Sequence, residues 1–594
     1  MLRWRRSGTP QQGRRASLCT CDGGSARCSG PGVSRAGVLA VAAAACVAAL
    51  AAARAVPPTL ERWQLSPDAV EHLAIANALV HGAGFVDPVQ WAYYLPVGPP
   101  HPAFAVRAPL VPLLLAVPLG LGATLSQVLL LHALWASGLA GASVLVARRF
   151  MRLPAAAGVG LGIGGSLAWA TVASHPWTEA TSLGALLLVL VTARGVLRSV
   201  PGALACAACT LVAWCTRPNL GLLAPALVLA ALWQLGPRAA LRSRSLWAYA
   251  LGFAVLHQLV VHAVRGLTGQ APYAGYGFLL EVLRVPDAWL YQTRYLGPWS
   301  FVTAHASEVA QRLLENACAL ARALFLDPRF QWAGWLLPAA LVAALRDRGG
   351  DAFEARVCLV LALGLAIAAV GNLAVFDALR FPLPIAMASW LAGLWALDRV
   401  ALRRAARASG KRAALWQAAP LAVAALLFAP ASALPLAREL RGLVAGGAPG
   451  PVQERYDAWD GRARAWCRYL EPDAVVAAPS PWSFALWCGN AALRIPSDLV
   501  SQAWLARFLD EKRPRYLAAS GPRFETLFDG SPRLLRRAAL GRSFLYEVVD
   551  AGSPGAWRAP PPPACAGRGE ACPRRVRRSR RSRWRLTPSQ TRSR

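Results

Sequence analysis

The sequence predicts an all-α polytopic membrane protein with a small α/β domain near its C-terminal end. Three observations support this: the composition, the recurrence of apolar segments, and a change of pattern after residue 445. The chain of 594 residues is 56% hydrophobic and 16% charged, with a mean hydropathy of +0.38. Soluble domains carry about 25% charged residues. Apolar runs of about 20 residues are long enough to cross a bilayer as helices.

Apolar segments recur from residue 36 to residue 426 and set the expected membrane helices. They are Ala36–Ala55, Pro109–Leu121, Leu125–Ala147, Ala155–Ala173, Thr181–Leu197, Ala203–Cys215, Leu220–Leu235, Leu246–Ala263, Trp332–Leu345, Val357–Phe376, Phe381–Leu397 and Ala414–Leu426. A full crossing by the short, proline-rich Pro109–Leu121 would place Arg148 outside. We therefore expect that segment to be re-entrant or partly crossing, among about 11 to 13 membrane helices of which about eleven cross fully.

Arginine placement predicts which loops face the cytoplasm, because basic residues favour the inner side. Arginines between residues 3 and 15 keep the N-terminus inside, so Val56–Val106 emerges outside. The arginines predicted to lie in inner turns are Arg148, Arg149, Arg152, Arg194, Arg198, Arg238, Arg242, Arg244, Arg346, Arg348, Arg356 and those of Arg399–Arg412. The other outer loops are Ser174–Ala180, Thr216–Asn219, Arg265–Gln331 and Asp377–Arg380, and the chain after Pro430 also lies outside.

The first outer loop begins with an acidic helix start. Asp68 and Glu71 are three residues apart, so on a helix they share one face. An apolar stripe at helical spacing suits a helix lying on the membrane surface; it consists of Leu73, Ala76, Leu79 and Val80. Two glycines, Gly82 and Gly84, end this helix. From composition alone, the two acids are equally typical of any helix start.

Aromatic residues mark two of the outer loops. Trp91, Tyr93 and Tyr94 in the first loop suit the bilayer interface. The long loop Arg265–Gln331 contains Tyr273, Tyr276, Trp289, Tyr291, Tyr295 and Trp299. That loop is either an interfacial lid or an aromatic belt that anchors two helices.

Residues 446–550 have the alternating pattern of a small soluble α/β domain. Strands are expected at Ala474–Ala478, Tyr516–Ala519 and Phe544–Val549, with a helix at Ser501–Glu511. The membrane domain then covers residues 36–435. Cys467 and Cys488 fall in the outer domain, where they form either a disulfide or two buried free thiols.

The net charge of +33 is concentrated at the two ends of the chain. Residues 1–35 hold seven arginines and residues 574–594 hold ten. Both tails, residues 1–35 and 551–594, are of low complexity and are expected to be disordered; a misassigned start and a read-through end would explain them. Each tail has one Trp, without the repeated aromatics typical of a single-strand binder, so nucleic acid is not the expected partner.

Further polar residues cluster in the outer loops. Glu179 lies in SHPWTEA, Arg217 in CTRPN and Arg380 in DALRFPLP. Together with Asp68, they suit a general base and a phosphate-bearing substrate on one side of the membrane. The other interpretation is that Glu179 is a helix-dipole acid and the arginines are interface residues. Because the sequence has no nucleotide loop, Ser–His–Asp set or metal motif, the donor is expected to be a membrane-borne molecule.

These motifs resemble the GT-C superfamily of polyprenyl-phosphate-sugar-dependent glycosyltransferases, and most closely bacterial proteins similar to protein O-mannosyltransferases and lipid A aminoarabinose transferases. The matching segments are Asp68, Ala69–His81, GAGF at Gly82–Phe85, RAPLVP at Arg107–Pro112, Glu179, Arg217–Pro218, RFPLP at Arg380–Pro384 and PSPWSFALWCGNAALRIPSD. The chain departs from the family at two positions: His72 stands where Tyr is common, and Glu179 where Asp is frequent.

The resemblance implies a hexosyl or pentosyl glycosyltransferase of the bacterial inner membrane that acts on its periplasmic or extracellular face. Catalytic roles fall on Asp68 as base, assisted by Glu71 and Glu179, and phosphate binding falls on Arg217, Arg380 and Arg107. The residues expected to contact substrate are His72, Tyr93, Tyr94 and His101. The donor would be a polyprenyl-phosphate sugar and the acceptor a lipid, glycan or protein, with metal dependence left open.

Two other classes of function remain. A transporter or flippase for a lipid-linked or small anionic solute would more often carry charges at mid-membrane or broken helices in paired halves. The third class is a non-catalytic membrane scaffold.

Overall fold

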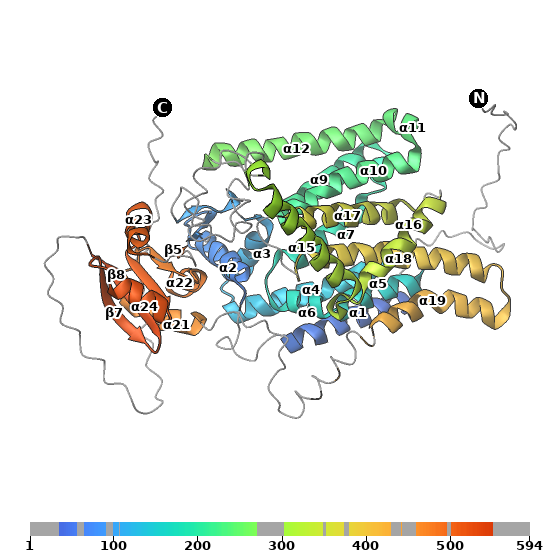
Figure 1. The fold of residues 1–594 in the computed structure, drawn as a ribbon. Coiled ribbons are helices and arrows are strands. Elements are labelled where there is room, and N and C mark those ends of the chain that lie inside the picture. Colours follow the sequence, from blue (N-terminus) through green and yellow to red (C-terminus); the bar gives the residue numbers. More distant parts are fainter. Residues whose placement is uncertain are drawn as a thin grey trace.

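The computed structural model describes residues 35–55, 65–90, 99–105, 107–269, 302–347, 352–372, 379–428, 459–495 and 501–549, together with residues 272, 430, 437 and 441. Its larger part is a bundle of helices and its smaller part is a six-stranded sheet with helices on both faces (Figure 1). The prediction of an α-helical membrane protein with a C-terminal α/β region is therefore confirmed.

The helices match the predicted apolar segments closely. In the bundle they are α1 (Arg35–Ala55), α2 (Pro67–Val80), α3 (Leu110–Gly120), α4 (Leu125–Ala147), α5 (Leu153–Gly165), α6 (Leu167–Ser174), α7 (Thr178–Thr192), α8 (Gly195–Arg198), α9 (Val200–Thr216), α10 (Leu223–Leu235), α11 (Pro237–Leu241), α12 (Arg244–Thr268), α15 (Ala306–Phe325), α16 (Leu336–Arg346), α17 (Phe353–Val370), α18 (Pro382–Ala405) and α19 (Gly410–Phe428). Glycine allows α5 to approach α1, because a Cβ at Gly160 would lie 2.8 Å from the Cβ of Ala44.

Six helices in the described residues are long and apolar enough to cross a membrane, or seven if one bent pair counts as a single span. The bent pair is α5 and α6, which meet at 59°. The expectation of one continuous helix over Ala155–Ala173 is therefore wrong. The hydroxyl of Ser166 accepts a hydrogen bond from the backbone N–H of Trp169 and so caps a new helix there.

Shorter apolar helices account for the remaining predicted crossings. With 11 residues and a rise of about 1.5 Å per residue, α3 reaches roughly 16 Å, about half the hydrocarbon thickness. This length agrees with the expectation of a partly crossing segment. The total of about eleven full crossings stays a prediction.

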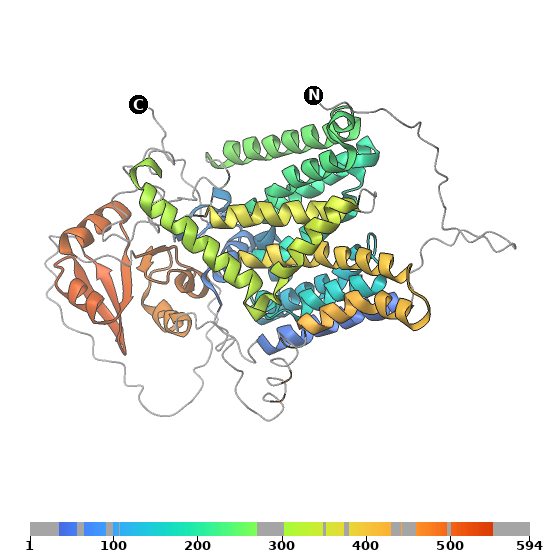
Figure 2. The same ribbon diagram turned by 45° about the vertical axis from the view of Figure 1, so that its right-hand side comes forward.

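The expected outer loop Arg265–Gln331 is in part a helix. α15 occupies Ala306–Phe325 and runs obliquely across its neighbours (Figure 2). The side-chain amide of Asn316 donates to the carbonyl oxygens of Val370 and Asn372, at 3.1 and 2.7 Å, which ties α15 to the end of α17. The aromatic residues from Tyr273 to Trp299 lie outside the described residues, so the interpretation as a lid or belt stays a prediction.

The C-terminal domain packs at one end of the bundle, which we call the domain end; the opposite end is the far end. Figure 1 shows α2 beside the C-terminal domain, with α11 and the α18–α19 turn at the far end. The predicted inner arginines that the structure describes lie in or beside helix ends of the far end, while Asp68 and Glu71 lie in α2; Arg348 falls outside the described residues. The arginines predicted to face the cytoplasm and the acids predicted to face outward therefore lie at opposite ends of the bundle.

The sheet of the C-terminal domain has the strand order β2-β5-β4-β6-β8-β7. Its strands are β2 (Val89–Gln90), β4 (Val476–Ala478), β5 (Ala492–Arg494), β6 (Tyr516–Ser520), β7 (Leu534–Leu540) and β8 (Ser543–Val548), and its helices are α21 (Trp459–Trp466), α22 (Trp482–Cys488), α23 (Gln502–Lys512) and α24 (Pro522–Asp529). The three strands and the helix predicted here are all present.

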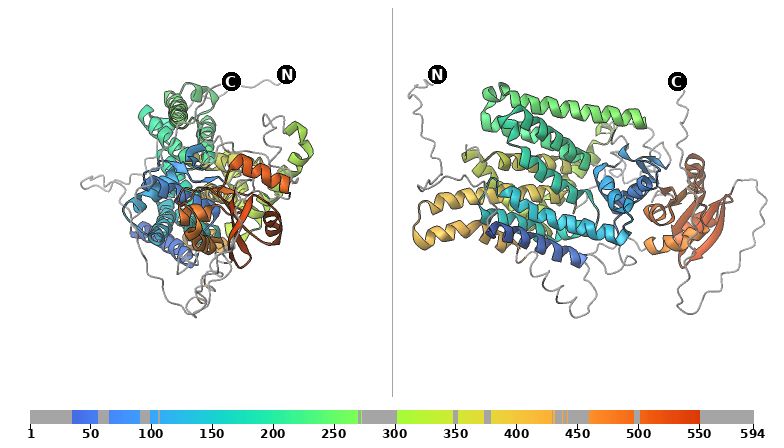
Figure 3. Two further views of the ribbon diagram at one scale, coloured as in Figure 1. Left: turned by 90° about the vertical axis from the view of Figure 1, so that its left-hand side faces the viewer. Right: turned by 180° about the vertical axis from the view of Figure 1, so that it is seen from behind.

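The edge strand β2 comes from the first loop after α1 rather than from the C-terminal domain. It pairs parallel with β5, matching Val89 with Ala492. Within the same loop, β1 (Val86–Asp87) pairs antiparallel with β3 (His101–Pro102). The first loop and the C-terminal domain are therefore joined by backbone hydrogen bonds, an arrangement visible from behind in Figure 3.

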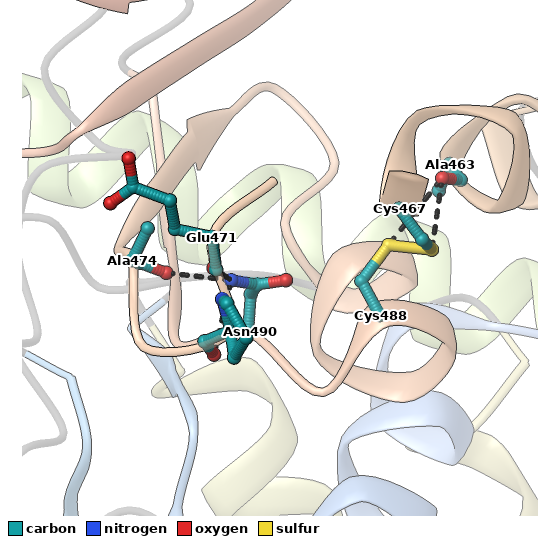
Figure 4. The surroundings of a disulfide bond; sticks show 7 residues. Ala463, Cys467, Glu471, Ala474, Cys488 and Asn490 are labelled. Atoms are coloured by element: carbon teal, nitrogen blue, oxygen red, sulfur yellow. Dashed lines mark hydrogen bonds between the residues drawn. A yellow bond between two sulfur atoms is a disulfide. The ribbon is translucent and has the colours of Figure 1, made fainter. Parts of the chain in front are cut away.

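The two cysteines of the domain, Cys467 and Cys488, form a disulfide (Figure 4). This resolves the choice between a bridge and two free thiols. Nearby, the side-chain amide of Asn490 donates to the carbonyl oxygens of Glu471 and Ala474 at 2.7 and 2.9 Å. The Cys467–Cys488 disulfide joins the C-terminal end of α22 to the turn that follows α21.

Candidate functional site

The site is built on α2, whose first turn carries its acidic residues. Ser66 caps the helix by accepting from the backbone N–H of Ala69 at 3.3 Å. The helix ends at Val80, and Gly82 and Gly84 follow with φ of +78° and +86°, as the sequence predicted.

The expectation that α2 lies on the membrane surface stays a prediction. Protein covers only part of the apolar stripe: Leu73 and Ala76 are 1% and 0% exposed, where α2 packs against α3 and α22, whereas Val80 is 37% exposed. α2 is thus held between the bundle and the C-terminal domain, with its acids at the junction.

Three carboxylates and three arginines meet at the domain end in one ion-pair network. Its members are Asp68, Glu71, Arg107, Glu179, Arg217 and Arg380. All six were predicted from separate sequence motifs, and the structure brings all six together. The sequence separations reach 312 residues, between Asp68 and Arg380, so tertiary folding alone joins them.

Arg107 holds the two acids of α2. Its guanidinium donates through Nε to Glu71 Oε1 at 2.5 Å and through Nη2 to Glu71 Oε2 at 2.7 Å. The same Nη2 lies 2.7 Å from Asp68 Oδ1. Arg107 is 8% exposed, so these bonds are largely shielded from water.

Arg380 links α2 to α7. It donates to Asp68 Oδ2 and, through Nε, to Glu179 Oε1 at 2.8 Å. Arg217 donates to the same Glu179 oxygen at 2.5 Å. The guanidinium of Arg380 also lies 5.2 Å from the ring centroid of Trp177. Glu179 is therefore shared by two arginines, and Arg380 by two carboxylates.

Exposure is uneven within the network. The side chains of Asp68, Arg380 and Arg217 are 23%, 16% and 11% exposed, whereas those of Glu71 and Glu179 are completely buried. The face of the network that a ligand can reach is therefore formed by Asp68 with Arg380 and Arg217. Glu71 and Glu179 lie behind it.

The arginines control the ionisation of Asp68. Burial alone would raise the pKa of this carboxyl group, but the positive charges of Arg107 and Arg380 outweigh it and hold the pKa well below its usual range. In this arrangement Asp68 is a stable anion and a weak base.

A further carboxyl group, Asp87, lies behind Glu71 and was not predicted. It is fully buried at the end of β1, and its Oδ1 accepts from the backbone N–H of Val89 at 2.9 Å. Burial and the charge of Glu71 raise the pKa of Asp87 well above its usual range. Asp87 could have been found from the segment Gly84–Pro88 (GFVDP), in which an acidic residue comes three positions after the second glycine that follows α2.

The two predicted histidines differ in their surroundings. Both ring nitrogens of His72 lack a hydrogen-bond partner among the described residues, although the ring is 1% exposed. Burial, with the nearby charge of Arg107, lowers the pKa of His72 to about 3, so the ring is neutral. His101 is also buried, and its Nδ1 lies 3.3 Å from the carbonyl oxygen of Pro102. Burial lowers its pKa too. Tyr93 and Tyr94 fall outside the described residues.

The described residues contain no group of three or more His, Cys, Asp or Glu side chains placed to hold a metal ion. At the domain end each network carboxylate is already paired with at least one guanidinium. The donor set therefore does not fit a metal, and positive charge at this site comes from the arginines.

Comparisons with known proteins find relatives through structure alone. No protein-family model matches the chain, and no curated protein matches it by sequence. The fold is similar to that of the Archaeoglobus fulgidus oligosaccharyltransferase tethered with an acceptor peptide containing the NVT sequon, with 14% identity, 82% of this chain and 69% of that chain covered, and a TM-score of 0.51.

The same archaeal enzyme in complex with an inhibitory peptide and a dolichol-phosphate gives 13% identity, covers 87% of this chain and 75% of that one, and has a TM-score of 0.50. ArnT from Cupriavidus metallidurans in the apo state has 15% identity over 86% of this chain and 97% of that one, with a TM-score of 0.47. At this level of identity, the likeness to the archaeal oligosaccharyltransferase shows a shared fold.

Proposed function

We propose that this protein is an integral membrane glycosyltransferase that moves a sugar, with inversion, from a polyprenyl-phosphate donor to a hydroxyl or amine acceptor. The observation that supports it best is the shared ion-pair network at the domain end. Its reachable face joins a carboxylate, Asp68, to two arginines. These are the groups needed to accept a proton and to neutralise a phosphate.

Binding of the donor would rearrange the network. The phosphodiester of the donor presents two free oxygens, which can bind the guanidinium of Arg380 in a bidentate arrangement. Arg380 would then exchange Asp68 for phosphate oxygens, with Arg217 contributing a second positive charge. The loss of a neighbouring positive charge raises the proton affinity of Asp68. The donor would thus create the base that the reaction needs.

The chemical step follows from this arrangement. The acceptor oxygen or nitrogen attacks the anomeric carbon and gives its proton to Asp68, while the bond from that carbon to the phosphate oxygen breaks. The electron pair of that bond leaves with the polyprenyl phosphate, whose added charge is stabilised by Arg380 and Arg217. Attack opposite the leaving group inverts the anomeric centre.

The remaining predicted residues support this step. Arg107 and Glu71 hold Asp68 from behind, and Glu179 orients both phosphate-binding arginines. The ring nitrogens of His72, which have no hydrogen-bond partner among the described residues, would bind substrate hydroxyls. His101, Tyr93 and Tyr94 complete the proposed substrate contacts, with Tyr93 and Tyr94 proposed from the sequence alone.

The comparisons support the class of donor and acceptor. The archaeal enzyme of similar fold has been seen with a dolichol-phosphate and with acceptor peptide. We assign to this chain a lipid-phosphate donor and a lipid, glycan or protein acceptor, on the outer face of the bacterial inner membrane. A phosphatase fusion after Gly450 should be active and one after Gly410 silent; the reverse would place the site in the cytoplasm.

The distribution of buried charge favours an enzyme over a transporter. Buried charged side chains of the described bundle lie at both of its ends. Glu71 and Glu179 are at the domain end, and Glu354, Arg356 and Asp398 are near the far end. A transport path would need charges at intermediate depth.

The test is transfer by the purified protein in lipid nanodiscs. A panel of radiolabelled polyprenyl-phosphate sugars is supplied with lipid, glycan and peptide acceptors, and both transfer and donor hydrolysis are measured. We expect one donor to react without added metal and in the presence of EDTA. Transport of an intact donor across proteoliposomes, with no cleavage of any donor in the panel, would contradict the proposal.

A further inference from the structure

The C-terminal domain reaches the network through one side chain, Trp482. This residue opens α22, the helix that lies against α2. Its indole Nε1 donates to Glu71 Oε2 at 2.9 Å, across 411 residues of sequence. The ring packs against the hydrophobic core of the bundle and also against that of the C-terminal domain. Trp482 thus contacts both the bundle and the C-terminal domain.

The bond to Trp482 completes the partners of a buried charge. Glu71 is completely buried, and Arg107 occupies both of its oxygens. The indole is the third donor to this carboxylate and the second to Oε2. An ionised carboxylate without water needs such donors, and losing one costs more than losing a neutral hydrogen bond.

A chain of hydrogen bonds to charged groups runs from Trp482 to Asp68, on the reachable face. Trp482 donates to Glu71, Glu71 holds Arg107, and Arg107 holds Asp68 at 2.7 Å. The position of α22 is itself fixed by the disulfide at its C-terminal end. Displacement of α22 would therefore be passed to Asp68 through Glu71, which is completely buried, and Arg107, whose side chain is 9% exposed.

We propose that Trp482 is a positioning residue through which the C-terminal domain sets the geometry of Asp68. The proposal rests on the proposed function for its catalytic consequence, but the coupling between Trp482 and Glu71 can be measured without any reaction. The domain is then part of the active site rather than an appended module.

The key variant is Trp482→Phe, which removes the N–H and keeps most of the ring packing. Its matched control is Trp487→Phe in the same helix, since the indole nitrogen of Trp487 has no hydrogen-bond partner among the described residues. We expect W482F to lower kcat roughly 10- to 100-fold with the donor KM changed less than threefold, and W487F to stay within about twofold of the natural chain. Trp482→His, which restores a ring N–H, should recover part of the loss.

Thermal unfolding tests the coupling independently of activity. The set is the natural chain, W482F, Glu71→Ala and the double variant, each in nanodiscs. If the indole acts on Glu71, W482F lowers Tm by about 2–4 °C in the natural background and by less than 1 °C when Glu71 is absent.

The outcomes separate the two claims. Absence of transfer by the natural chain contradicts the proposed function and leaves the unfolding result standing. Additive Tm changes, or equal loss of kcat in W482F and W487F, would overturn the role of Trp482 even in an active enzyme. Should E71A fail to fold, the comparison of W482F with W487F still decides.

Discussion

The two ends of the bundle use the same residue types in different ways. At the far end, Arg152 donates to both carboxylate oxygens of Asp398, through its backbone N–H at 3.0 Å and its Nε at 2.7 Å. Both oxygens of this carboxylate are thus used by a single residue. At the domain end, by contrast, Glu179 is shared by Arg217 and Arg380, and Arg380 by Glu179 and Asp68.

This difference in connectivity separates the Arg152–Asp398 pair from the proposed binding site. Asp398 is buried and needs the charge of Arg152, whose own side chain is 27% exposed, so the pair fastens the start of α5 to α18. In the shared network an incoming anion can replace one carboxylate at Arg380, which still keeps Glu179. In the proposed mechanism, an anion can replace Asp68 at Arg380 because Arg380 is shared between two carboxylates. This exchange would take place at the face formed by Asp68, Arg380 and Arg217.

The largest effect should come from the residue that is shared. Arg380→Ala removes the guanidinium that meets both Asp68 and the proposed phosphate, so kcat/KM should fall by about 10³–10⁵-fold, with weaker binding of polyprenyl phosphate. Steady-state kinetics and lipid-phosphate binding measure the two effects. Normal phosphate binding by a folded R380A protein would contradict the assignment.

The far-end pair should show the opposite profile. Arg152→Ala removes the guanidinium from Asp398, which is 2% exposed and keeps only the backbone N–H of residue 152, and should lower the unfolding free energy by about 2–4 kcal/mol. In the folded fraction, kcat should remain within about twofold of the natural chain. Tm and kcat of the same preparation give the comparison, and a large loss of kcat at unchanged Tm would erase the distinction between the two ends.

A smaller effect concerns the pH dependence of stability. The pKa of His72 is lowered to about 3 in the folded protein, against about 6.5 in an unfolded chain. Between these values the unfolded state binds the extra proton, so the stabilising contribution is complete above pH 6.5 and is lost as pH falls towards 3.

His72→Gln should therefore reduce the fall in Tm between pH 6.5 and pH 4, since Gln does not titrate. His101, whose pKa is also lowered, keeps part of the slope in both proteins. Parallel Tm profiles for the two proteins would mean that His72 is protonated in the folded state.

The smallest effect is expected from the disulfide. Alkylation under non-reducing conditions should leave Cys467 and Cys488 unlabelled. Replacing both by serine should reduce kcat less than W482F does, since α22 also packs on α2. Full labelling of both cysteines in denatured, unreduced protein would show that they are free thiols and form no disulfide.

The sequence predicted which residues lie in the network better than how they connect. Asp68, Glu179 and Arg380 each sit in a motif at a helix end, and helix ends could be located from hydropathy and glycine placement. Their pairing could not, because it depends on tertiary contacts between segments hundreds of residues apart. Trp482, the proposed positioning residue, was missed because nothing in the local sequence distinguishes it from Trp487, the other tryptophan of α22.

Parts of the fold were missed for similar reasons. β2 has two residues, too few for any alternating pattern to identify, and its pairing with β5 is entirely non-local. α15 carries Glu308, Arg312, Glu315 and Arg322 on an amphipathic helix, so its mean hydropathy does not mark it among apolar segments. The packing of Leu73 and Ala76 against protein could not be predicted, because an apolar stripe looks the same whether lipid or protein covers it.

The most direct test of the account is Asp68→Asn, measured for turnover and for donor binding in the same preparation. The amide keeps the shape of the side chain but cannot accept the proton. We predict that kcat falls by about 10²–10⁴-fold while polyprenyl-phosphate binding is unchanged or tighter, since Arg380 loses a competing carboxylate. Near-normal transfer by folded D68N would show that another group is the base, and weaker phosphate binding would contradict the proposed exchange at Arg380.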